Sequence, residues 1–241
     1  MTWSLVARDA NGAVGVAVAS RFFAVGALCP HAASGVGAVS TQALVNPLYA
    51  PAALEAMARD VDPTVIVRAL TGADPGCEHR QLHLIDRAGR TAAHTGARCI
   101  EWCGHRAGRG FSVAGNMLAG PRVLDDTAGA FEQNHALPFA LRLIAAMEAG
   151  EAAGGDKRGK QAAALIVCTT ESYPALDLRV DDHPEPIVEL RRLYETSLDR
   201  FQPFVACLPR HDDPVGVTDR AVIEAAIERF QATRVRRPGT V

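Results

Sequence analysis

Thr2 is the residue whose type and position point most directly to chemistry. It opens residues 2–9, a largely apolar run that reads as a buried β-strand. Asn11-Gly12 separates this run from a second apolar run at residues 14–20. Asn-Gly between two such runs predicts a hairpin, because both residues tolerate positive φ. A strand that starts at residue two fixes Thr2 inside the fold.

Removal of Met1, which a small second residue allows, would give Thr2 a second reactive group. Its free α-amine would then lie beside its own hydroxyl. An α-amine has a pKa of about 8, so it can be neutral at working pH and take the hydroxyl proton. The alternative is an ordinary first strand in which Thr2 merely follows Met1.

A cluster of glycines surrounds charged residues at positions 154–159, Gly-Gly-Asp-Lys-Arg-Gly. Ordering glycines costs chain entropy that a plain connector need not incur, which favours a functional role. We expect Asp156 to orient the Thr2 amine and to stabilise it once protonated, as the third member of a triad does. We expect Lys157 to contact a substrate carboxylate. The alternatives are that Asp156 caps a turn and that Lys157 or Arg158 is solvated.

Polar residues close two of the expected strands. Ser40, Thr41 and Gln42 end a strand of small residues and can supply amide or side-chain donors to a developing oxyanion. Asn116 closes a later strand, and its amide can hold the substrate or the nucleophile. The alternatives are polar residues that face solvent at a strand end, and ordinary turn chemistry after Gly115.

Arg21 and two histidines are further candidates. Arg21 leaves an apolar strand, and its guanidinium can bind both oxygens of a carboxylate, although pairing with an acidic side chain of the protein explains it nearly as well. His31 and His94 are rival bases that would serve Ser40 or Cys29. A lone histidine is more often structural.

The cysteines argue against a metal site. Six of them are scattered along the chain, and a reducing compartment would keep them as free thiols. Cys99 and Cys103 lie near His94 and His105, but their spacing matches no compact set of zinc ligands. We expect neither a metal nor a cofactor.

The composition is that of an ordinary globular protein. Hydrophobic residues make up 48% and charged residues 22%, and the net charge is −2. Nothing in this balance calls for nucleic acid or an anionic membrane as a partner. No apolar stretch reaches a membrane-spanning length, and no secretory signal is evident. We therefore expect a cytoplasmic protein that acts on a small molecule.

Periodicity and punctuation predict alternating groups of strands and helices. After the first hairpin, strands are expected at residues 35–42, 81–86, 91–95, 111–117, 162–169 and 176–180. Helices are expected at residues 51–59, 63–70, 187–200 and 219–230, and over most of residues 121–150.

This order predicts an α+β fold. Antiparallel hairpins interleaved with pairs of helices favour two stacked, mostly antiparallel sheets with helices outside, a four-layer αββα sandwich. The nearly continuous apolar run at residues 162–167 fits a sheet buried on both faces. We expect one main domain at residues 2–192. Residues 193–241 would be a helical extension packed on that domain or on a partner subunit, in a homo-oligomer.

A four-layer sandwich whose first strand begins with a nucleophile resembles the N-terminal nucleophile hydrolases. The match is closer to one family of that class, the bacterial domain of unknown function 1028 (DUF1028), over residues 2–192. The shared segments, in running order, are Thr2 to Asp9, Val18 to Gly26, Thr41-Gln42-Ala43, Asn46-Pro47, His94-Thr95-Gly96, Gly115 to Leu118, Ala153 to Gly159 and Asp177 to Asp181.

The resemblance implies a hydrolase in which Thr2 cleaves an amide or related C–N bond in a small molecule. Thr2, Asp156, Thr41 and Asn116 would be catalytic. Ser20, Arg21, Ser40, Gln42, Asn46 and Lys157 would bind the substrate. Ala19 stands where proteasome-type members have a catalytic aspartate. This departure supports the alternative of a non-catalytic member that binds a small ligand or a protein partner. A third possibility is a site built on a histidine.

Overall fold

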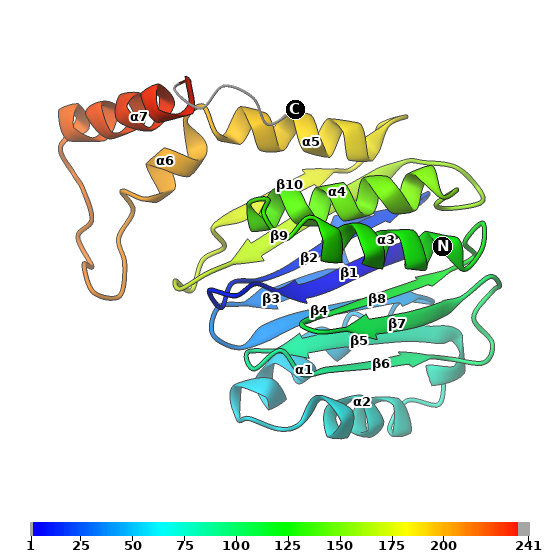
Figure 1. Cartoon of the computed structure of the whole chain (residues 1–241). Coiled ribbons are helices and arrows are strands. Elements are labelled where there is room, and N and C mark those ends of the chain that lie inside the picture. The colour runs from blue at the N-terminus through cyan, green and yellow to red at the C-terminus, as the bar shows by residue number, and fades with distance from the viewer. Residues whose placement is uncertain (1, 236–241) are drawn as a thin grey trace. The chain divides into compact units, whose positions relative to one another are not determined.

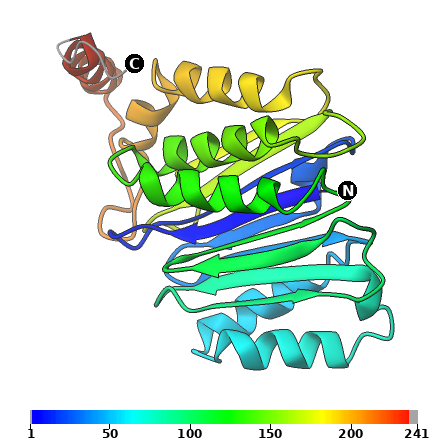
Figure 2. The ribbon, with the colours of Figure 1, turned by 45° about the vertical axis from the view of Figure 1, so that its right-hand side comes forward.

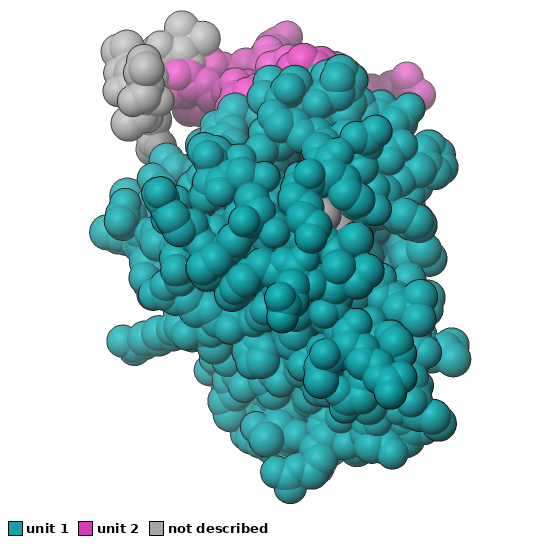
Figure 3. All heavy atoms as spheres, turned by 90° about the vertical axis from the view of Figure 1, so that its right-hand side faces the viewer, with its two compact units in different colours: residues 1–191 teal, residues 192–241 magenta. Residues whose placement is uncertain are grey.

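The computed structural model describes residues 2–235. Its contacts divide the chain into two units, with the division after Arg191 (Figure 3). This lies one residue before the boundary expected from the sequence.

Two antiparallel sheets form the centre of the first unit (Figure 1). The larger sheet has the strand order β10-β9-β2-β1-β8-β7, and the smaller sheet has the order β3-β4-β5-β6. The strands are β1 (Thr2–Arg8), β2 (Val14–Ser20), β3 (Pro30–Ala33), β4 (Gly37–Ala43), β5 (Arg80–Asp86), β6 (Thr91–Thr95), β7 (Gly104–Gly108), β8 (Phe111–Asn116), β9 (Ala162–Cys168) and β10 (Leu176–Val180).

Helices cover the outer face of each sheet (Figures 1 and 2). The larger sheet contacts α3 (Arg122–Gln133) and α4 (Phe139–Ala152), and the smaller sheet contacts α1 (Tyr49–Ala58) and α2 (Pro63–Gly72). The inner faces meet where β1 contacts β4 and β8 contacts β5. The fold is therefore the four-layer α+β sandwich that the sequence predicts. Two short 3₁₀ helices, Val25–Ala27 and Cys77–His79, complete the connections.

Alternation along β1 decides which side chains reach each layer. Val6 packs between the sheets with Ala38 and Ile85 of the smaller sheet. Trp3 faces the other way, where a Cβ added to Gly155 would come within 3.2 Å of its ring. Because successive strand residues point to opposite faces, Thr2 and Ser4 share the inner face with Val6. The nucleophile candidate thus points between the two sheets.

Most elements follow the sequence pattern. The hairpin of β1 and β2 is confirmed, with Gly12 at φ 94° in the turn. The helical stretch after residue 121 breaks before Pro138, which precedes the first residue of α4. The pattern did not predict β3 and β7, which are short strands at the edges of the two sheets and are not fully buried.

The second unit is helical. It contains the end of α5 (Pro186–Ser197), with α6 (Phe201–Val205) and α7 (Arg220–Val235). Arg200 pairs with Glu224, and Arg234 pairs with Asp199 at 3.2 Å. Whether this extension packs on the main domain or on a partner stays a prediction. No helix within residues 2–235 combines the length and apolarity needed to cross a membrane.

Candidate functional site

Thr2 is the first residue of β1, a central strand of the larger sheet that is paired with β2 on one side and β8 on the other. In the register, Thr2 stands opposite Asn116 of β8, and the Trp3–Ala19 pair places it beside Ser20 of β2. The Thr2 hydroxyl donates a hydrogen bond to Ser20 Oγ at 3.2 Å. Only 5% of Thr2 is exposed. The strand pairing and this hydrogen bond together hold the hydroxyl at one edge of the sandwich.

Three carboxamides form a hydrogen-bonded group next to the carbonyl oxygen of Thr2. We call this group, Gln42, Gln81 and Asn116, the amide platform. Gln42 Nε2 and Asn116 Nδ2 each donate to the Thr2 carbonyl at 3.3 Å. The same two nitrogens donate to Gln81 Oε1, each at 2.9 Å. All three side chains are buried. The platform joins both sheets, because Gln42 and Gln81 come from the smaller sheet and Asn116 from the larger.

A second polar group lies deeper between the sheets. Ser4 Oγ is 2.7 Å from His83 Nε2, 2.6 Å from Gln42 Oε1 and 2.9 Å from Ser40 Oγ. His83 Nδ1 is 3.2 Å from Ser112 Oγ. Complete burial, reinforced by the nearby His105, lowers the pKa of His83 to about 3.

The hydrogen bonds around Ser4 connect both sheets. Ser4 has one hydroxyl proton, and the short contact to Gln42 Oε1 uses it. His83 bridges Ser4 and Ser112 through its two ring nitrogens. A chain of polar contacts thus runs from Ser112 through His83 and Ser4 to Gln42, and Gln42 Nε2 donates to the Thr2 carbonyl.

Asp156 fastens the glycine-rich segment to the end of β2. Its Oδ2 accepts the backbone N–H of Arg21 at 2.7 Å, and its Oδ1 accepts that of Arg158 at 2.8 Å. The Arg158 guanidinium lies 3.2 Å from the same carboxylate. Gly155 has φ 48°, a conformation that residues with a Cβ rarely adopt. Asp156 therefore shapes the turn that follows Ser20, the hydrogen-bond partner of Thr2.

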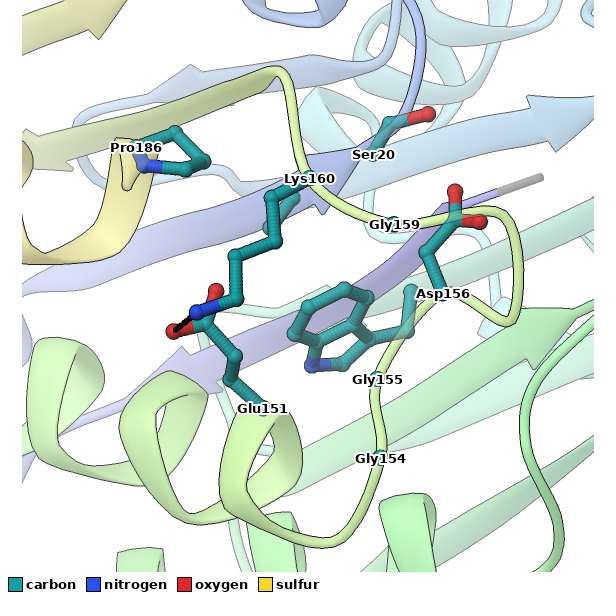
Figure 4. Close-up of a pocket in the computed structure, with 10 residues that line it drawn as sticks. Ser20, Glu151, Gly154, Gly155, Asp156, Gly159, Lys160 and Pro186 are labelled. Atoms are coloured by element: carbon teal, nitrogen blue, oxygen red, sulfur yellow. Dashed lines mark ion pairs between the residues drawn. The ribbon is translucent and has the colours of Figure 1, made fainter. Parts of the chain in front are cut away.

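A small cavity adjoins this turn (Figure 4). Its volume is about 80 Å³. Lys160 crosses it and pairs with Glu151 at 3.0 Å, as the dashed line in Figure 4 marks. The lining consists of Trp3, Ala19, Ser20, Glu151, Gly154, Gly155, Asp156, Gly159, Lys160 and Pro186. Ala19 contributes only a methyl group here, so it supplies no carboxylate to this end of the sheet.

Other residues singled out from the sequence are engaged with backbone or loop groups. Thr41 Oγ1 donates to the Asn46 carbonyl at 3.1 Å, and Asn46 Nδ2 donates to Asp74 at 3.2 Å. Lys157 Nζ donates to the Glu101 carbonyl at 2.7 Å. Arg21 Nη1 donates to the Arg158 carbonyl at 2.7 Å. Ser40 and Gln42, in contrast, lie in the polar group around Ser4.

The rival bases and the thiols lie in other surroundings. His94 contacts the Cys77 carbonyl at 3.0 Å, and His31 contacts the Leu28 carbonyl at 3.3 Å. Burial raises the pKa of Cys29 to about 12, which keeps this thiol protonated. Among residues 2–235, no three His, Cys, Asp or Glu side chains gather as a metal site.

Four residues of the site were missed by the sequence reasoning: Ser4, Gln81, His83 and Ser112. Gln81 and His83 alternate with Leu82 and Leu84 along β5, a pattern typical of a strand with one face in water. In the fold that polar face meets the polar face of β1 and is buried. The signal was present, because Ser4 lies between Trp3 and Leu5 and likewise alternates with apolar residues.

Two comparisons with known proteins give the same family. A family described as being of unknown function, DUF1028, matches residues 2–190. The crystal structure of protein SPO2555 from Silicibacter pomeroyi, described as DUF1028, is 30% identical with a TM-score of 0.84, covering 91% of this chain and 96% of that one. The ancestral β-subunit Anbu from Yersinia bercovieri is 11% identical with a TM-score of 0.40, covering 81% and 94%. No curated protein sequence matches.

Proposed function

The chain belongs to the DUF1028 family, and on that premise and the site around Thr2 we propose that it is an N-terminal-threonine hydrolase. It cleaves an amide or related C–N bond in a small molecule after removal of Met1. The observation that carries the proposal is the setting of Thr2. Its hydroxyl is oriented by Ser20 and its carbonyl is held by two buried amides, in a sandwich of the type used by N-terminal nucleophile hydrolases.

The reaction needs only groups on Thr2 for its first step. The α-amine takes the proton from Oγ1, and Oγ1 forms a bond to the substrate carbonyl carbon. The tetrahedral intermediate collapses by breaking the C–N bond, and the protonated amine gives its proton to the departing nitrogen. Water then attacks the resulting ester, which releases the acid and restores Thr2. No oxidant or cofactor is required for this balance.

The neighbours of Thr2 have separate roles in the proposal. Ser20 orients the nucleophile, and Asp156 fixes the turn that carries Ser20 and Arg21. The Gln42 and Asn116 amides hold the Thr2 carbonyl and are not oxyanion donors, because both N–H bonds of each amide already have acceptors. The protein acts in the cytoplasm, and copies of it associate.

The test is the mass of untagged protein before and after treatment with a β-lactone. We expect loss of Met1 and a single adduct on Thr2. Hydroxylamine should remove the adduct, because it cleaves an ester on Oγ1 but spares an amide on the amine. Thr2→Ala should abolish labelling, whereas Thr170→Ala, which changes an exposed threonine, should not. Retention of Met1, or an unlabelled Thr2, would defeat the proposal.

Ala19 favours a second candidate, a non-catalytic protein that binds a small ligand or a protein partner. Its side chain supplies only a methyl group to the cavity beside Ser20, where proteasome-type members have a catalytic aspartate. Under this alternative the cavity holds a ligand that is never cleaved. The same labelling experiment separates the two, because only the hydrolase forms an ester on Thr2.

A further inference from the structure

We propose that Gln81 is a positioning residue for the nucleophile: its carboxamide holds the two amides that fix the Thr2 carbonyl. This inference rests on the proposed function. Gln81 lies on β5, in the other sheet from Thr2, and is fully buried. Its side chain has no hydrogen bond to Thr2 itself, so any effect on Thr2 must pass through Gln42 and Asn116.

Counting donors shows how tightly the platform is bound. The Gln42 amide has two N–H bonds, directed at Thr2 O and Gln81 Oε1. The Asn116 amide has the same two acceptors. Each amide nitrogen thus donates both of its hydrogens, and Gln81 Oε1 accepts one hydrogen bond from each nitrogen. Gln81 is the shared acceptor that prevents either amide from turning its N–H away from Thr2.

The orientation of Gln81 is itself fixed by its other end. Gln81 Nε2 lies 2.7 Å from the Gly115 carbonyl, 3.1 Å from the Gly104 carbonyl and 3.0 Å from Thr95 Oγ1. A reversed amide would place Oε1 against two carbonyl oxygens. The reversed orientation is therefore excluded, and the observed one presents Oε1 to Gln42 and Asn116.

Holding the carbonyl matters because the reactive groups of Thr2 extend from the same Cα. The α-amine is bonded to this Cα directly, and Oγ1 is bonded to it through Cβ. The platform fixes rotation of the Thr2 carbonyl, and the bond to Ser20 fixes rotation of the side chain. With both rotations fixed, the direction from the α-amine to Oγ1 and the approaching substrate is set. Small errors in such alignment are costly for a reaction that depends on orientation.

The experiment measures the rate constant of β-lactone labelling of Thr2 in full-length protein lacking Met1. Gln81→Met keeps the length of the side chain but removes both polar ends. Because it leaves the N–H groups of Gln42 and Asn116 that face Gln81 without an acceptor, we expect labelling to slow about tenfold or more. The matched control is Gln202→Met, because the wild-type Gln202 side chain donates a hydrogen bond to Ser197 at 2.9 Å in the second unit. In this variant Thr2 should be labelled at the wild-type rate.

Loss of fold and loss of alignment have different signatures. Unfolded protein lowers the fraction labelled, whereas misalignment lowers the rate constant at full labelling. Gln81→Glu provides the second variant. Its protonated carboxyl still donates a hydrogen bond to Gly115 O, and its ionised form cannot. Its labelling rate relative to wild type should therefore fall as pH rises.

The outcomes separate this inference from the function on which it rests. If wild-type protein forms no adduct, the proposed hydrolase is wrong. If wild-type protein is labelled but Gln81→Met reacts at an unchanged rate constant, Gln81 has no positioning role and the hydrolase stands. A pH-independent ratio for Gln81→Glu would overturn the inference in the same way.

Discussion

Because His83 is buried in its neutral form, we expect the sandwich to lose stability in mild acid. The perturbation is a drop from about pH 7.5 to about pH 4.5, compared between wild type and His83→Gln. A free histidine has a pKa of 6.5, whereas burial holds the pKa of His83 at about 3. Below pH 6.5 the unfolded chain binds a proton at this position and the folded chain does not. The contribution is present above pH 6.5 and is lost as pH falls towards 3.

The magnitude follows from the width of that window. Between pH 6.5 and pH 4.5 the unfolded state binds a proton at this position and the folded state does not. Each of these two pH units lowers the unfolding free energy by about 1.36 kcal/mol. Wild type should therefore lose about 3 kcal/mol of unfolding free energy from His83 alone. Burial also lowers the pKa values of His31 and His105, so their contributions fall in the same direction. Comparison with His83→Gln subtracts them.

Urea unfolding at the two pH values measures the difference. The variant should lose about 3 kcal/mol less than wild type on acidification, whatever its stability at neutral pH. His135→Gln, which changes an exposed histidine, should retain the wild-type pH dependence. Equal acid losses in wild type and His83→Gln would refute the argument that this imidazole is buried in its neutral form.

Two further predictions concern packing and the turn after β2. Gly150→Ala would place a Cβ 2.2 Å from Thr127 Oγ1 and 2.9 Å from Trp3 Nε1, so it should cost about 1–3 kcal/mol in urea unfolding. Gly129→Ala meets nothing within 4 Å and should instead gain about 1 kcal/mol; a loss at both sites would contradict the packing argument. Asp156→Asn removes the negative charge that accepts the Arg21 N–H and pairs with the Arg158 guanidinium. It should lower the free energy of unfolding by about 2 kcal/mol and slow the labelling of Thr2. Unchanged stability and labelling would mean that this carboxylate does not hold the turn.

The sequence predicted the architecture because local patterns and tertiary burial agree over most of the chain. Asn11-Gly12 defined the first hairpin, and the all-apolar β9 indicated a sheet covered on both faces. The edge strands β3 and β7 were missed because their side chains are only partly buried. Their sequences, Pro-His-Ala-Ala and Gly-His-Arg-Ala-Gly, also lack the alternation of apolar and polar residues that marks the edge strand β10.

The site was only partly predictable, for a different reason. Asn116 and Gln42 were singled out because they close strands, and both reach the Thr2 carbonyl. The alternation at Gln81 and His83 is typical of a strand with one solvent-exposed face. Periodicity indicates that one face of a strand is polar, but it does not indicate what covers that face. Only the stacking of one sheet on the other turns that polar face into a buried network.

The pairing of β1 on both sides has a consequence for proteolysis. An aminopeptidase needs several residues of extended, unpaired chain in its own cleft before it can cut. Thr2 and the residues after it are hydrogen-bonded to β2 on one side and to β8 on the other. To trim past Thr2, an enzyme would have to pull a central strand out of a six-stranded sheet, which amounts to unfolding the sandwich. The fold thus gives exopeptidases a natural stopping point at the residue on which the proposed chemistry depends.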